Sequence, residues 1–121
     1  MRAALILLAA AGAACARPAP EAVAVELACA PARSPLEQRC SVRLTDRNSG
    51  RPLEGARVTL HADMPSMPLA HAARPVSAVP GARPGTYEGT LELEMPGRWV
   101  VAVRIAGPVS DQVTRVLDVS P

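Results

Sequence analysis

The residues best suited to chemistry in this sequence are two methionines and two histidines within residues 61–71. Met64 and Met67 stand three residues apart, with His61 three residues before the first and His71 four residues after the second. Thioether sulfur is a soft donor that selects Cu(I) over hard ions such as Mg²⁺ or Ca²⁺. Thioethers do not titrate, so a site built on them tolerates acid better than a site of imidazoles alone. The pattern therefore indicates a candidate Cu(I)-binding loop, which several prolines would stiffen.

The same residues have two other interpretations. Methionine is a common filler of gaps in cores, and a loop crossing the end of a sandwich can place Met64 or Met67 on the core. In that case His61 is an ordinary outward-facing strand residue. An exposed loop rich in Met and Pro can instead dock a protein partner, because adaptable surfaces often use methionine. Residue types alone favour the packing role over the metal.

Motifs for catalysis are not found in the sequence. It contains no G-x-S-x-G elbow, phosphate-binding loop, H-E-x-x-H helix or C-x-x-C-H haem site. No Ser or Cys stands in a recognisable nucleophile motif beside the two histidines. Glu88, Glu92 and Glu94 alternate along one predicted strand, as a solvated strand face would. We therefore expect a protein that is not an enzyme.

Composition bounds the class of protein and its partners. The 121 residues suit one domain, and an apolar share of 49% excludes full disorder. Thirteen prolines oppose a helical bundle, because each one breaks a helix interior at a cost of about 3 kcal/mol. The 13 basic residues, all arginine, are scattered, and the net charge is only +2. Nucleic acid binding needs a clustered basic surface, so no nucleic acid partner is expected.

The N-terminus has the pattern of a secretory signal over residues 1–16. Arg2 is followed by an uncharged, apolar run at residues 3–14, with small residues near a cut site, and this run is too short for a transmembrane helix, which needs about 20 residues. Two processing routes are open, namely cleavage after Ala16 or lipidation of Cys15 within a lipoprotein-like box at residues 12–15. Both place the mature chain in the periplasm or cell envelope, the second with a lipid anchor. No later stretch is long enough to cross a membrane.

Behind a proline-containing leader at residues 17–21, the folded domain is expected to span residues 22–121. Cys29 and Cys40 form an even pair in an oxidising compartment, which predicts one disulfide. In the chain-entropy model, a loop this short would stabilise the fold by roughly 3 kcal/mol. The spacing fits neither C-x-x-C nor a zinc pattern, so a structural role is favoured over a redox pair or metal thiolates.

Alternation of apolar and polar residues predicts a series of short strands. They lie at about residues 22–29, 39–45, 56–63, 76–79, 87–95, 99–105 and 112–119. Pro96-Gly97 is expected to turn the fifth and sixth strands into a hairpin, with Tyr87 and Trp99 facing the core. Tyr87 suits a tyrosine corner that ties its hydroxyl to nearby backbone, and Arg115 in the inward phase marks the last strand as an edge. The pattern is that of an all-β, antiparallel sandwich of about seven strands.

Four segments together resemble the YtkA-like domain family, within the broader FixH-like group. They are NSGRPLEGARV at residues 48–58, MPSMPLAH at 64–71, PGTYEG at 84–89 and MPGRWV at 95–100. The resemblance spans about residues 42–106. It implies an immunoglobulin-like sandwich in the bacterial envelope, often near copper-handling or cation-pump systems, and it implies no catalytic residues. Unlike FixH-like proteins, this chain lacks a retained membrane helix, which argues against a role inside an oxidase-assembly membrane complex.

Together these observations predict an exported, non-enzymatic β-sandwich that binds or delivers Cu(I). Met64 and Met67 would be the ligands, with His71 and His61 assisting. The alternative is a metal-free accessory module that docks an envelope protein complex through the same loop.

Overall fold

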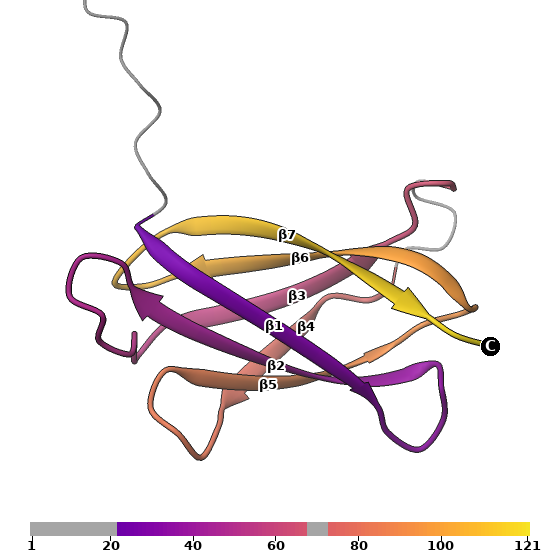
Figure 1. Cartoon of the computed structure of the whole chain (residues 1–121), viewed down its shortest axis with the longest axis horizontal. Coiled ribbons are helices and arrows are strands. Elements are labelled where there is room, and N and C mark those ends of the chain that lie inside the picture. The colour runs from indigo at the N-terminus through magenta and orange to yellow at the C-terminus, as the bar shows by residue number, and fades with distance from the viewer. Residues whose placement is uncertain (1–21, 68–72) are drawn as a thin grey trace, which may run out of the picture.

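A computed structural model describes residues 22–67 and 73–121, which form seven antiparallel strands (Figure 1). The strands are β1 Val23–Pro31, β2 Glu37–Asp46, β3 Arg57–Asp63, β4 Val76–Pro80, β5 Thr86–Glu92, β6 Gly97–Ala106 and β7 Asp111–Val119. The predicted all-β class is confirmed. Within the described ranges the chain forms no helix that could cross a membrane. The predicted signal and leader at residues 1–21, with Cys15, lie outside the described residues.

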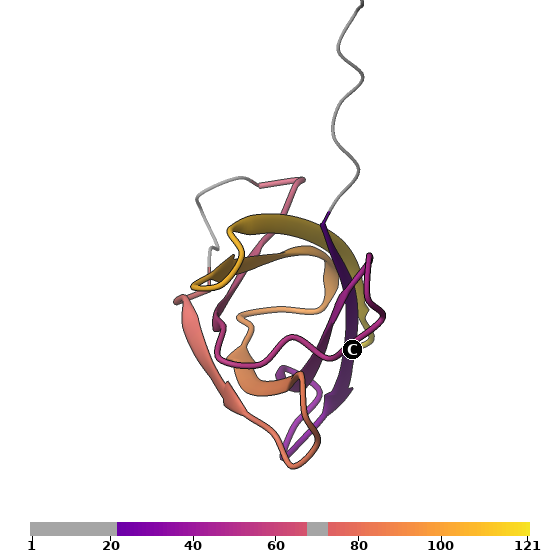
Figure 2. The ribbon, with the colours of Figure 1, turned by 90° about the vertical axis from the view of Figure 1, so that its left-hand side faces the viewer.

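The strands form two layers that β4 joins into one nearly closed sheet (Figure 2). The order is β1-β2-β5-β4-β3-β6-β7. Strand β4 pairs first with β3, where Val76 opposes Leu60, and then with β5, where Val79 opposes Glu88. Layers of β1-β2-β5-β4 and β3-β6-β7 match the arrangement of an immunoglobulin constant-type domain. The expected immunoglobulin-like sandwich is therefore present, with β4 shared between its layers.

The predicted hairpin of residues 87–95 and 99–105 is wrong. Strand β5 pairs with β2 and β4, whereas β6 pairs with β3 and β7, so the Pro96-Gly97 turn carries the chain from one layer to the other. Just before this crossing, the Leu93 N–H donates to the Leu36 carbonyl, which keeps the chain beside β2. The error has a physical cause: alternation shows which face of a strand is buried, and both layers bury that face in the same core.

The core between the layers is filled mainly by aliphatic side chains around Trp99. Trp99, Leu44, Leu60 and Leu91 are fully buried, and the Trp99 indole N–H donates to the Met95 carbonyl at 3.1 Å. Trp99 therefore fills the inter-sheet core, as predicted. Gly89 contributes space to this packing, because a Cβ there would lie only 3.3 Å from Leu60 Cδ1.

Tyr87 fixes the crossing of the chain from β2 to β3. Its hydroxyl donates to the Leu53 carbonyl at 2.9 Å and accepts from the Ala56 N–H at 3.1 Å. The phenol thus ties to backbone, as a tyrosine corner would, but to a segment more than 30 residues upstream instead of nearby backbone. The reason is that β5 pairs with β2, so the Tyr87 hydroxyl reaches the segment that leaves β2.

Strands β1 and β7 are the two edges of the sheet, and they meet at a seam. Arg115 of β7 lies in the inward phase with Val113 and Leu117, and its Nη2 donates to the Val25 carbonyl of β1 at 3.2 Å. The predicted edge position of the last strand is confirmed. Inward-pointing charge is a common way to protect a sheet edge from further pairing.

Replacing the Tyr87 hydroxyl tests how strongly it holds the crossing. Tyr87→Phe leaves the Leu53 carbonyl and the Ala56 N–H without this partner, and we expect the free energy of unfolding to fall by about 1–3 kcal/mol. Urea unfolding followed by Trp99 fluorescence measures it, with Thr114→Val on the outer face of β7 as the control. An unfolding midpoint equal to that of the control would show that the hydroxyl does not anchor this segment.

Candidate functional site

All three methionines that follow Met1 lie at one end of the sandwich, which we name the methionine end. Met64 and Met67 follow β3, and Met95 lies between β5 and β6. The connection between β1 and β2 and the last residues of β7 reach the same end, on the right in Figure 1. The strand order thus gathers segments that are far apart in the sequence.

Met64 packs into the core at this end. Its side chain is 5% exposed, and its Cε lies 3.0 Å from the position that a Cβ on Gly97 would take. Gly97 has a φ of 136°, which glycine adopts more readily than other residues. The Met64 N–H donates to Oδ1 of Asp63 at 2.9 Å, which fixes the start of the loop. One of the two predicted thioether ligands therefore also closes the end of the core.

Met67 lies on the turn that Met64 begins, and it points to solvent. Its N–H donates to the Met64 carbonyl at 3.1 Å, and its side chain is 40% exposed. Few large apolar side chains are exposed in the described part of the chain. Besides Met67 they are Val79 and Val116. The turn therefore places one thioether on the core and the other where a ligand or partner can reach it.

The two histidines are placed differently. His61 lies in β3 opposite Ala102 of β6, between the buried residues Leu60 and Ala62, so it belongs to the outer face of that layer. Met64 continues the inner face, and β3 therefore directs the two side chains to opposite sides. His71 lies outside the described residues.

Met95 is a third thioether at the same end, and it continues the apolar phase of Leu91 and Leu93. It is half-buried and packs against the core, which agrees with its apolar phase. It also stands two residues before Gly97, the position that Met64 touches. The turn Pro96-Gly97 indicated that a connection follows Met95. The predicted hairpin was wrong about which strands this connection places side by side.

Two charged residues near the methionine end, Arg98 and Asp118, form an ion pair. Arg98 of β6 donates from Nε to Oδ1 of Asp118 of β7 at 2.9 Å, and both side chains are exposed. The hydrogen bond to Asp118 raises the pKa of Arg98, so its guanidinium stays charged. Among the described residues, no group of three or more His, Cys, Asp or Glu side chains could hold a metal ion.

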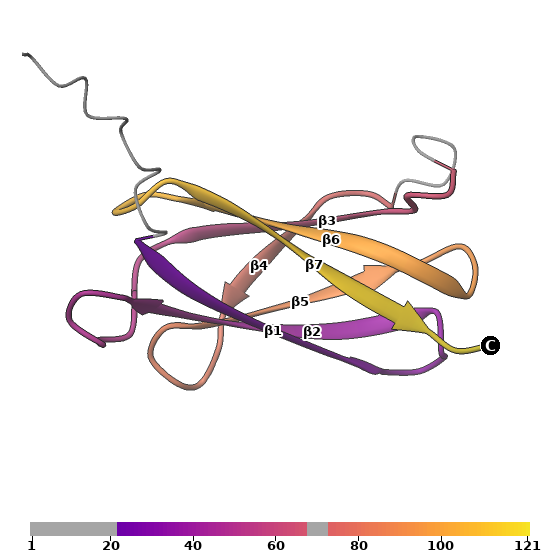
Figure 3. The ribbon, with the colours of Figure 1, turned by 45° about the horizontal axis from the view of Figure 1, so that its top comes forward.

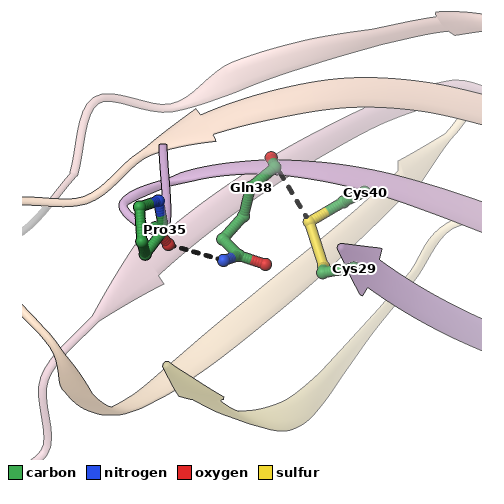
Figure 4. The surroundings of a disulfide bond; sticks show 4 residues. All are labelled: Cys29, Pro35, Gln38 and Cys40. Atoms are coloured by element: carbon green, nitrogen blue, oxygen red, sulfur yellow. Dashed lines mark hydrogen bonds between the residues drawn. A yellow bond between two sulfur atoms is a disulfide. The ribbon is translucent and has the colours of Figure 1, made fainter. Parts of the chain in front are cut away.

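Cys29 and Cys40 form a disulfide between directly opposed residues of β1 and β2 (Figure 4). The bond lies within one layer, whereas the disulfide of antibody domains joins the two layers. Beside it, the buried Gln38 donates from Nε2 to the Pro35 carbonyl at 2.7 Å and so fixes the β1–β2 turn. The disulfide therefore ties β1 to its neighbour near the methionine end.

Comparison with known proteins identifies the domain. The family model described as YtkA-like matches residues 19–104, more than half of the chain. The chain belongs to the YtkA-like family. This YtkA-like match includes the methionine end and both cysteines of the disulfide. Neither a curated protein nor a solved structure matches the chain.

The two loop methionines should differ sharply in what they contribute to stability. Met64→Ala removes a buried side chain and should lower the free energy of unfolding by about 2–5 kcal/mol. Met67→Ala removes an exposed side chain and should change it by less than about 0.5 kcal/mol. Urea unfolding of both variants checks the difference. Equal losses would mean that Met67 also belongs to the core.

Proposed function

We propose that this YtkA-like domain is an exported, non-enzymatic protein that binds Cu(I) at its methionine end. The observation that carries the proposal is the turn that links the backbones of Met64 and Met67 by a hydrogen bond, with Met95 on another connection at the same end. Thioether sulfur is the protein donor that suits Cu(I) best without a thiolate. The segments that hold the three thioethers are anchored by strands on both layers of the sandwich.

The exposed Met67 would meet the ion first. Met64 would follow by turning outward, since methionine has three rotatable bonds and adapts its shape readily. His71 stands four residues after Met67 and supplies the imidazole of the proposed site. His61 lies on the outer face of β3, so its assistance should be weaker than that of His71.

The proposed location is the periplasm or cell envelope. The segment at residues 1–16 would direct export, and lipidation of Cys15 would add a membrane anchor. The Cys29–Cys40 disulfide supports an oxidising compartment, since such bonds are rare in the cytosol of most cells. Mass spectrometry of the protein extracted from membranes distinguishes the two processing routes, because lipidation adds diacylglycerol and acyl mass.

A metal-free docking module is the second candidate. The observation that favours it is the burial of Met64, whose thioether already packs against the core. In this alternative the exposed Met67 alone would contact an envelope protein. Both candidates use the same turn, so the experiment must separate binding of the ion from binding of a partner.

A Cu(I) competition titration against a chromophoric chelator tests the metal site. We expect Met64→Leu/Met67→Leu to weaken Cu(I) binding on the order of tenfold or more, because leucine fills similar volume without a sulfur donor. Val79→Leu, which enlarges an exposed apolar residue away from the loop, is the matched control. His71→Ala should weaken binding more than His61→Ala does.

Equal competition by the wild type and the double variant would overturn the Cu(I) site. The docking candidate then gains its own test, in which the full chain is crosslinked to envelope proteins in cells. Under that alternative, Met67→Glu should remove the crosslinked product, whereas Met67→Leu should retain it.

A further inference from the structure

The seam between β1 and β7 opens toward the methionine end. No ladder joins these two edge strands (Figure 3), and Arg115 bridges them at Val25. A hollow of about 380 Å³ lies between the end of β1 and the end of β7. Its walls include Cys29, Gln38 and Leu117. Cys29, and not Cys40, therefore borders the hollow at the seam.

The two cysteines differ in exposure. Cys40 lies in the central part of its layer, between β1 and β5, and is 0% exposed. Cys29 lies on the edge strand, is partly exposed, and also lines a second, larger hollow on the outer face of β1, β2 and β5. An incoming thiolate would therefore meet the Cys29 sulfur and not the Cys40 sulfur.

We propose that the Cys29–Cys40 disulfide is a site of thiol–disulfide exchange, which an external dithiol enters at Cys29 through the seam. The role is separate from the Cu(I) site and does not depend on it. Exchange rates depend on which sulfur is attacked and on access to it. Because Cys29 is partly exposed and Cys40 is buried, the arrangement determines which of the two sulfurs is attacked.

The exchange proceeds in two steps. A thiolate of the dithiol forms a bond to Cys29 Sγ, the Cys29–Cys40 bond breaks, and Cys40 Sγ leaves with the electron pair and takes up a proton. The Gln38 carbonyl lies 3.9 Å from Cys40 Sγ, where it can accept the new S–H (Figure 4). The second thiolate of the dithiol then attacks its partner sulfur in the mixed disulfide and releases Cys29. Two electrons pass to the protein, and the dithiol becomes a disulfide.

Single-cysteine variants of the full chain test the direction of attack. Cys15→Ser/Cys40→Ser leaves Cys29 as the one thiol, and Cys15→Ser/Cys29→Ser leaves Cys40 as the one thiol. We expect the Cys40 thiol to react with a chromogenic aromatic disulfide at least about tenfold more slowly than Cys29, because it is inaccessible in the folded protein. Urea should abolish this difference. Equal rates in the folded state would overturn the proposal.

Reduction of the wild-type chain by dithiothreitol tests the seam as the route. The rate should rise in proportion to the dithiothreitol concentration while the Trp99 fluorescence of the folded protein persists. Leu117→Trp should fill the hollow and slow reduction several-fold, whereas Val116→Trp, on the adjacent outward-facing residue, should not. A rate that is independent of dithiothreitol and equals the unfolding rate, or an unchanged rate in Leu117→Trp, would contradict entry through the seam. The Cu(I) titration of each variant separates this result from the copper proposal.

Discussion

The double pairing of β4 determines how the rest of the molecule is organised. Its first residues hydrogen-bond to β3 and its last residues to β5, so two layers that a typical sandwich keeps apart become one continuous sheet. A chain with a single tryptophan and a single tyrosine has few large side chains with which to hold two separate sheets together. Backbone hydrogen bonds from β4 to β3 and β5 connect the two layers at one side of the molecule. At the other side lies the seam, where no ladder joins β1 to β7.

The candidate thioether ligands lie in connections next to the strands that pair with β4. The loop with Met64 and Met67 connects β3 to β4, and Met95 lies on the connection that returns the chain from β5 to the opposite layer. The disulfide lies beside the hollow at the seam between β1 and β7. Strand ladders thus hold the scaffold, while the Met67 side chain is exposed and Cys29 of the disulfide is partly exposed at the methionine end. Soft sulfur chemistry at one end of a stable β-domain is the common element of both proposals.

The strands, the inward-facing residues and the cysteine pair could be predicted from alternation and compartment. The neighbours of β5 and β6 could not, because period-two alternation is the same for a hairpin and for two strands in facing layers. The partners of the Tyr87 hydroxyl were hidden for the same reason, since they depend on which strand lies beside β5. The opposite faces of His61 and Met64 were readable from the strand period, whereas the exposure of Met67 depends on how the following turn folds.

The most direct test of the central claim is methyl NMR of the protein labelled at the methionine ε-methyl carbons. Met→Leu variants assign the resonances of Met64, Met67 and Met95. One equivalent of Cu(I) should shift the Met67 and Met64 signals together, because coordination by sulfur changes the shielding of the attached methyl group. Binding of Cu(I) that leaves both signals in place would contradict a thioether site at the methionine end.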